Sequence, residues 1–182
     1  MLFKVELENF HSIRDRQVVD LRVPASAPKD TNRLTGCWTE SNARVPKVVA
    51  VFGPNGSGKS NLLRALSFCS WFVDASCSNT LNDRLPFEPF YDQNSLNSPT
   101  KINVSFSVLD FAESNNDGNG VRRPFSYELE IGNKNGRQKV LKESMFFWPI
   151  KSNRKTCLFH RNQDGMVRVG AKITFNFRAV FS

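Results

Sequence analysis

Hydrophobic and polar residues alternate at the start of the chain. Phe3, Val5 and Leu7 occupy every second position and are separated by charged residues, which is the period of a strand with one buried face. The pattern predicts a strand over residues 2–8 and, after a turn, a second short strand over 17–21. Because only a short turn separates the two segments, we expect them to pair as a hairpin.

The pattern then changes twice before residue 74. Residues 24–46 hold three prolines among Ser, Asn, Thr and Asp, so we expect a long surface insertion, with Trp38 as its anchor. Residues 47–52 are apolar without alternation, which is typical of a central strand buried on both faces. Behind a glycine-rich stretch, apolar residues at helical spacing predict a helix that runs to about Asp74.

From residue 100 the period of two returns and indicates antiparallel structure. Apolar residues alternate over 102–108 and again over 125–131, on either side of a polar loop, which predicts a hairpin. Asn135-Gly136 and Asp164-Gly165 are signals for type I′ turns. The further strands that these turns predict lie near residues 139–148, 155–161 and 166–177. The second half is therefore expected to be a β meander, and because alternation continues to Phe181 we expect the chain to be truncated.

Composition narrows the class of protein. The chain has 182 residues, a formal charge of +8, 40% hydrophobic and 23% charged residues, and 16 Phe, which excludes wholesale disorder and supplies a core. No apolar run approaches the roughly 18 residues of a membrane span, and the charged N-terminal segment is unlike a secretory signal. We expect a cytoplasmic protein with no membrane contact. Its four Cys and two His form no zinc-site or disulfide pattern.

One motif carries chemistry. The run Gly53-Pro54-Asn55-Gly56-Ser57-Gly58-Lys59-Ser60 matches the phosphate-binding loop GxxxxGK[ST]. Glycines let successive N–H groups point at phosphate oxygens, and the following helix adds its positive end. Lys59 would reach the β- and γ-phosphates of ATP, the Ser60 hydroxyl would ligate Mg²⁺, and Asn61 would open the helix beside them. A glycine turn that merely joins a strand to a helix is the alternative, and the flanking strand and helix disfavour it.

The catalytic half of such a site is not visible in the sequence. Hydrolysis also needs a carboxylate that helps to hold Mg²⁺, at the end of a buried strand. The one apolar run that ends in Asp reaches Asp110, but its alternation indicates a half-solvated hairpin strand. The catalytic residues therefore stay unknown.

The same residues resemble a known family. Residues 2–13, with the sequence LFKVELENFHSI, and 51–66, with VFGPNGSGKSNLLRAL, resemble the start of ABC-type ATPase heads of the SMC, Rad50, RecF and OLD-like group, and among them the prokaryotic ATPases of DNA repair and anti-phage defence. The match is close over 1–22 and 47–74 and only a pattern over 86–161. It implies an α/β fold, the N-terminal lobe of a P-loop NTPase head, as one unit over 1–182 with the insertion at 24–46 and the antiparallel subdomain over 100–182.

The resemblance also implies a mechanism. Two heads would sandwich ATP and Mg²⁺ as a homodimer or higher oligomer, and ATP hydrolysis would release them. His11 departs from the pattern, because many members carry Arg there, close to the nucleotide; a nucleotide role and a local turn role for His11 both stay open. The glutamine that senses Mg²⁺ in the family could be Gln93, Gln138 or Gln163, each expected in a turn. No signature motif of the Ser-Gly-Gly kind follows.

Basic residues gather in the second half, with Phe146, Phe147, Trp148 and Phe159 among them. They are Lys134, Arg137, Lys139, Lys142, Lys151, Arg154, Lys155, Arg161, Arg168, Lys172 and Arg178. Such a set could bind nucleic acid through phosphate contacts and base stacking, or it could simply be solvated strand faces. Two functions follow: an ATP-binding lobe linked to nucleic-acid processing in defence or repair, or an ATP-dependent scaffold that restrains a partner nuclease or toxin.

Overall fold

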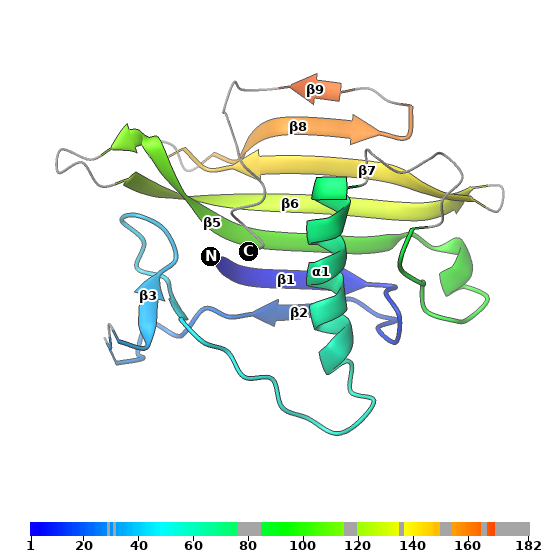
Figure 1. The fold of residues 1–182 in the computed structure, drawn as a ribbon, viewed down its shortest axis with the longest axis horizontal. Coiled ribbons are helices and arrows are strands. Elements are labelled where there is room, and N and C mark those ends of the chain that lie inside the picture. The colour runs from blue at the N-terminus through cyan, green and yellow to red at the C-terminus, as the bar shows by residue number, and fades with distance from the viewer. Residues whose placement is uncertain are drawn as a thin grey trace.

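One antiparallel sheet with a helix across it accounts for most of the described chain (Figure 1). The computed structural model describes residues 1–28, 30, 32–75, 85–114, 120–134, 137–149, 154–164 and 167–169. The strands of the sheet, in spatial order, are β2 (Gln17–Asp20), β1 (Leu2–Glu8), β5 (Thr100–Ser114), β6 (Gly120–Lys134), β7 (Arg137–Phe147), β8 (Thr156–Asn162) and β9 (Val167–Val169). Every neighbouring pair among them is antiparallel.

The predicted hairpin and meander are confirmed. Strand β1 pairs with β2, with Val5 opposite Val19, and β5 to β9 follow one another in sequence and in space. The turn at Asn135-Gly136 lies outside the described residues, although Lys134 pairs with Arg137 across it. The predicted strand near residues 166–177 is described only as β9, and the rest of it lies outside the described part of the chain.

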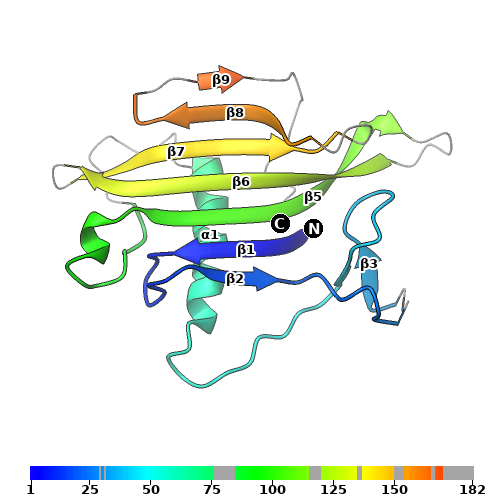
Figure 2. The ribbon, with the colours of Figure 1, turned by 180° about the vertical axis from the view of Figure 1, so that it is seen from behind.

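Helix α1 (Lys59–Ala75) closes one face of the sheet, as Figures 1 and 2 show from its two sides. Its buried residues Ala65, Phe68, Cys69 and Phe72 recur at helical spacing. They pack on the inward-facing residues of the strands in one core, which include Val5, Leu7, Ile102, Val104, Phe106, Tyr127, Leu129 and Met145. The opposite face of the sheet carries no helix among the described residues (Figure 2).

Phe3 does not share the face of Val5 and Leu7, contrary to the alternation in the sequence. A register shift between Leu2 and Lys4 in the pairing of β1 with β5 acts as a bulge and turns Phe3 to the other face of the sheet. Phe3 there forms a second, smaller core with Met1, with Leu21 before the insertion, and with four residues of the insertion, which are Cys37, Trp38, Ala43 and Val45.

The insertion at residues 24–46 is more regular than its composition predicts. It contains the antiparallel strands β3 (Leu34–Gly36) and β4 (Arg44–Pro46). Cys37 is fully buried and Val45 nearly so. Trp38 packs on Phe3 with ring centroids 5.6 Å apart, so the expected anchoring role of Trp38 is confirmed. The sequence did not predict this hairpin, because strands of three residues are too short to show alternation and the prolines around them favoured a loop.

The predicted central strand over residues 47–52 is wrong for this structure. The segment has no strand pairing, and Val48 and Phe52 are 85% and 88% exposed. A strand buried on both faces needs other elements packed above and below it, but this segment pairs with no described strand and its large apolar side chains are exposed. The segment instead runs past the sheet as the extended connection from β4 to α1 (Figure 1).

The fold class is therefore only loosely α/β. The described chain is mostly antiparallel sheet, with α1 as its one α-helix. Within these residues no helix has both the length and the apolar character needed to cross a membrane. Cys37, Cys69 and Cys157 are free thiols, and the described residues contain no cluster of three or more His, Cys, Asp or Glu side chains suited to a metal ion.

Candidate functional site

The glycine-rich loop has a backbone that side chains would disfavour. Gly56 and Gly58 have φ angles of +80° and +88°, in the left-handed region that glycine adopts without strain. A Cβ on Gly58 would make only an ordinary contact, 3.7 Å from the Ile13 side chain, so the φ angle and not the space favours glycine there. Within the described residues, no hydrogen-bond acceptor is assigned to the backbone N–H groups of Gly56, Gly58, Lys59 and Ser60. The loop thus keeps a set of N–H donors at the start of α1, where an anion is favoured.

Lys59 folds back over this loop. Its ammonium donates hydrogen bonds to the carbonyl oxygens of Gly53 at 2.8 Å and Pro54 at 2.6 Å, and to Ser57 Oγ at 3.3 Å. Three oxygens therefore hold the Lys59 charge at the mouth of the loop, where phosphate oxygens would compete for the same donors. Ser60 follows in the first turn of α1 and is exposed, so its hydroxyl is accessible to a cation.

A cleft of about 650 Å³ lies beside the loop, within the size range of ligand pockets. The loop and Leu62 form one wall. The turn between β1 and β2 forms the other, through Ser12, Ile13, Arg14, Asp15 and Gln17. The sequence indicated this second wall only through the resemblance over residues 2–13, because the short polar turn carries no spacing that marks a ligand. A hydrogen bond from Asn61 to Ser12 joins the turn to the start of α1. The donors, the lysine and the cleft together fit a nucleotide.

A comparison with protein families agrees with this geometry. The profile of one family, described as "AAA domain, putative AbiEii toxin, Type IV TA system", matches residues 48–149, more than half of the chain. The chain belongs to this AAA domain family. Membership implies a P-loop ATPase that binds nucleotide, usually with Mg²⁺. A comparison with curated proteins found no match.

Asn61 of the AAA domain ties the helix to the second wall of the cleft. It is 9% exposed, and its Nδ2 donates to Ser12 Oγ at 2.6 Å while Arg64 donates to its Oδ1 at 3.3 Å. The Asn61 side chain therefore holds the β1–β2 turn against the start of α1.

His11 does not line the cleft. Its backbone N–H donates to the Glu88 carbonyl at 2.8 Å, and its ring meets Phe10 edge-on at 4.6 Å. Burial, and then the nearby positive charge of Arg64, lower the pKa of His11 against the smaller opposing effect of Glu88. The structure therefore gives His11 local partners in the turn, and its nucleotide role stays a prediction.

The remaining candidates of the sequence also stay apart from the cleft. Asp110 pairs with Val121 in the β5–β6 ladder, and its side chain lies outside the described part. Gln93 and Gln163 are exposed in turns. Gln138 is not in a turn but in β7, where its Oε1 accepts from the Leu85 N–H at 2.9 Å. None of these side chains lines the cleft, so the carboxylate and the Mg²⁺-sensing glutamine stay unassigned.

Several basic residues of the second half of the chain are paired with carboxylates. Lys142 and Lys155 both donate to Glu128, at 3.2 and 2.6 Å, and Arg161 donates to Glu143. Both lysines lower the pKa of Glu128 against the effect of its burial. Arg137 and Lys139 are exposed. Residues 151, 172 and 178 and the side chains of Lys134 and Arg168 lie outside the described part.

The aromatic residues of this half differ in burial. Phe147 is 6% exposed and belongs to the main core, and Phe159 packs against that core. The Lys155 Nζ lies 3.8 Å from the centroid of the Phe146 ring and 5.9 Å from that of the Trp148 ring. Phe146 and Trp148 are thus the aromatic residues that remain beside a cation at the surface.

Proposed function

We propose that this chain is the ATP-binding lobe of an ABC-type ATPase of the SMC, Rad50 and OLD-like kind. The observation that carries the proposal is the glycine loop at the start of α1, in which free N–H groups, the Lys59 ammonium and the exposed Ser60 hydroxyl converge beside a cleft of about 650 Å³. Backbone donors of the loop bind the phosphates, Lys59 neutralises the β- and γ-phosphates, and Ser60 ligates Mg²⁺.

Residues on the second wall of the cleft contact the rest of the nucleotide in this proposal. Arg14 and Gln17 offer hydrogen-bond donors there, and Ile13 and Leu62 offer apolar surface. ATP would then join two heads, each closing the other's site, and hydrolysis would separate them.

A role in defence or repair is the second part of the proposal. Its support is the family description, which concerns a toxin of a toxin–antitoxin system, and the formal charge of +8, which favours a polyanionic partner. In this account the ATPase acts on nucleic acid or regulates such action.

A specific observation favours the second candidate, a scaffold that restrains a nuclease or toxin without itself contacting nucleic acid. Lys142, Lys155 and Arg161 are all engaged by Glu128 or Glu143, which removes charge from a nucleic-acid surface. The apolar side chains of Val48 and Phe52 are exposed, and such surface is suited to a protein partner.

Sedimentation with a non-hydrolysable ATP analogue and Mg²⁺ tests the proposal. We expect the analogue to bind and to increase the association of the chain, whereas ADP does not. A salt titration of DNA and RNA binding separates the two candidates. Affinity that falls linearly with salt on logarithmic axes supports nucleic-acid action, and the absence of binding supports the scaffold. If neither ATP nor its analogue binds, both candidates fail.

A further inference from the structure

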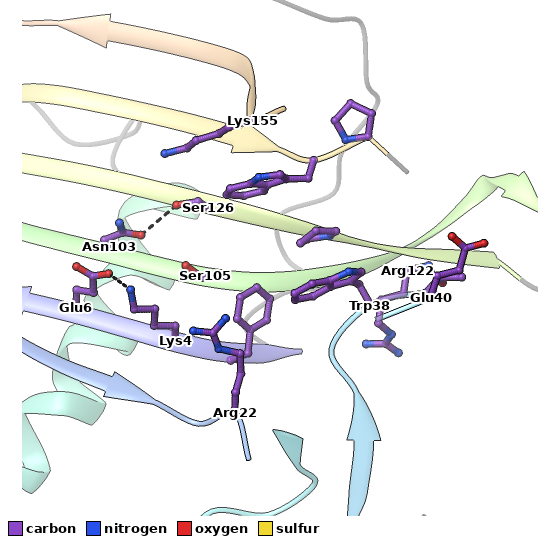
Figure 3. Close-up of a pocket in the computed structure, with 15 residues that line it drawn as sticks. Lys4, Glu6, Arg22, Trp38, Glu40, Asn103, Ser105, Arg122, Ser126 and Lys155 are labelled. Carbon is purple, nitrogen blue, oxygen red and sulfur yellow. Dashed lines mark hydrogen bonds and ion pairs between the residues drawn. The ribbon is translucent and has the colours of Figure 1, made fainter. Parts of the chain in front are cut away.

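The face of the sheet opposite α1, which Figure 2 shows toward the viewer, carries a pocket of about 600 Å³. Figure 3 shows this pocket with its lining side chains. Trp38 and Trp148 both line it, as does Phe3. Asn103, Ser105 and Ser126 project into it from β5 and β6 (Figure 3). Aromatic rings thus stand at the sides of a polar floor, which is the arrangement that holds a flat, hydrogen-bonding ring system.

Two features of the chain build this pocket. The bulge in β1 turns Phe3 to this face, where it packs against Trp38. The insertion is then clamped to β6, because the Thr39 N–H donates to the Arg122 carbonyl at 3.0 Å and the Arg122 N–H donates to Thr39 Oγ1 at 2.8 Å. The two hydrogen bonds of the neighbouring Thr39 therefore hold Trp38 on the sheet.

The charge of the lining is positive. Four cations, Lys4, Arg22, Arg122 and Lys155, face two carboxylates, Glu6 and Glu40. Lys4 pairs with Glu6, Arg22 with Asp20 and Lys155 with Glu128. Among the described residues the Arg122 guanidinium has no ion-pair partner, and Figure 3 shows it near Trp38. An anionic ligand can therefore take the Arg122 charge without breaking a pair.

The polar floor offers hydrogen bonds as well. Ser126 Oγ donates to Asn103 Oδ1 at 3.1 Å, which orients the amide (Figure 3). The Asn103 Nδ2 group then has two donors with no acceptor assigned in the described part of the chain. Carbonyl oxygens and ring nitrogens of a nucleobase accept such bonds.

We propose that this pocket binds an unpaired nucleotide of single-stranded nucleic acid, with its base stacked on the indoles, its edge hydrogen-bonded by Asn103 and its phosphate held by Arg122. Aromatic stacking combined with a basic groove is how proteins bind single strands without sequence preference. The inference rests on the nucleic-acid part of the proposed function and gives that part a site on the face of the sheet away from α1.

Fluorescence anisotropy of a labelled oligodeoxythymidylate tests the inference with the full chain. We expect Trp148→Ala to weaken binding roughly 5- to 150-fold, the range for loss of one base–aromatic stack, and Trp148→Phe to retain most of it. Arg122→Gln should weaken binding and reduce the slope of log affinity against log salt by about 1. The matched control is Arg137→Gln, because Arg137 carries the same charge, is exposed and does not line the pocket.

Each outcome has a meaning. Equal affinities for the wild type, Trp148→Ala and Arg122→Gln overturn the pocket as the site, and absence of oligonucleotide binding overturns the inference altogether. Competition by free AMP at the same nucleotide concentration identifies a mononucleotide pocket instead, and preferential binding of a proline-rich peptide identifies a protein site; both contradict the proposal. Unchanged binding of Mg·ATP in these variants shows that such a failure leaves the ATP site standing.

Discussion

Asn9 illustrates how much one buried polar residue does in this fold. It is 3% exposed with a φ of +54°, a conformation that asparagine tolerates better than most residues. Its Nδ2 donates to the carbonyls of Ser95 and Ser98, and its Oδ1 accepts from the Phe90 N–H. A single side chain therefore ties the segment before β5 to the turn that forms the second wall of the cleft beside the glycine-rich loop.

Asn9→Ala should destabilise the chain by about 1–3 kcal/mol, because it removes the hydrogen bonds of the part-buried Ser98 carbonyl and Phe90 N–H to this side chain. Urea unfolding followed by circular dichroism measures this free energy. Asn94→Ala is the matched control, since Asn94 is exposed and its side chain makes no cap hydrogen bond; it should change stability by no more than about 0.5 kcal/mol. Equal effects of the two substitutions would contradict the role of Asn9.

His11 gives a pH dependence with a definite sign. Burial and Arg64 lower its pKa below the ordinary 6.5, so between the lowered value and 6.5 the unfolded chain binds more protons than the folded one. Stability should therefore fall as the pH drops through this window. The melting temperature of the wild type should decrease more between pH 7 and pH 5 than that of His11→Asn, a residue that also tolerates the positive φ of this position. A wild-type loss no larger than that of the variant would show that His11 is not responsible.

At the scale of elements, the strands and the helix could be predicted wherever one face is buried and the other solvated. Alternation located β1, β5 and β6 because the apolar face of each packs on α1. The bulge that redirects Phe3 has no sequence signal, since it arises from the register between β1 and β5. The prediction for residues 47–52 was wrong for a related reason: their composition is that of a doubly buried strand, but pairing and burial depend on contacts with distant segments, and the described residues give this segment no strand partner.

Two phenylalanines in different environments test whether residues 47–52 lie outside the core. Phe52 is 88% exposed, whereas Phe68 is 4% exposed in the core beneath α1. Phe68→Ala should lower the free energy of unfolding by about 3–5 kcal/mol. The chemically identical Phe52→Ala should change it by no more than about 0.5 kcal/mol. Chemical denaturation of both variants measures the difference. A large loss for Phe52→Ala would mean that residues 47–52 are packed in a strand after all.

For the molecule as a whole, the candidate site divides into a part that sequence could predict and a part that it could not. The residues of the loop from Gly53 to Ser60 are consecutive, so the sequence alone identifies the motif. The opposing wall at Ser12 to Gln17 and the pocket around Trp38 and Arg122 join segments far apart in sequence. The hydrogen bond from Asn61 to Ser12 and the clamp between Thr39 and Arg122 bring those segments together.

We predict that the purified chain binds ATP but does not hydrolyse it. The one carboxylate that the sequence offers for Mg²⁺, Asp110, belongs to the β5–β6 hairpin. Phosphate release by the purified chain with ATP and Mg²⁺ should therefore stay at background. Turnover that is abolished in Asp110→Asn would instead place the missing carboxylate in that hairpin.

The central claim is that the loop at the start of α1 binds the phosphates of ATP, and one measurement tests it most directly. Equilibrium binding of a fluorescent ATP analogue with Mg²⁺ is compared for the wild type, Lys59→Ala and Lys47→Ala, the last being an exposed lysine outside the cleft. Loss of a charge-assisted contact predicts an affinity about 10- to 150-fold lower for Lys59→Ala and an unchanged affinity for Lys47→Ala, with circular dichroism confirming that each variant is folded. Equal affinities for the wild type and Lys59→Ala would contradict the account.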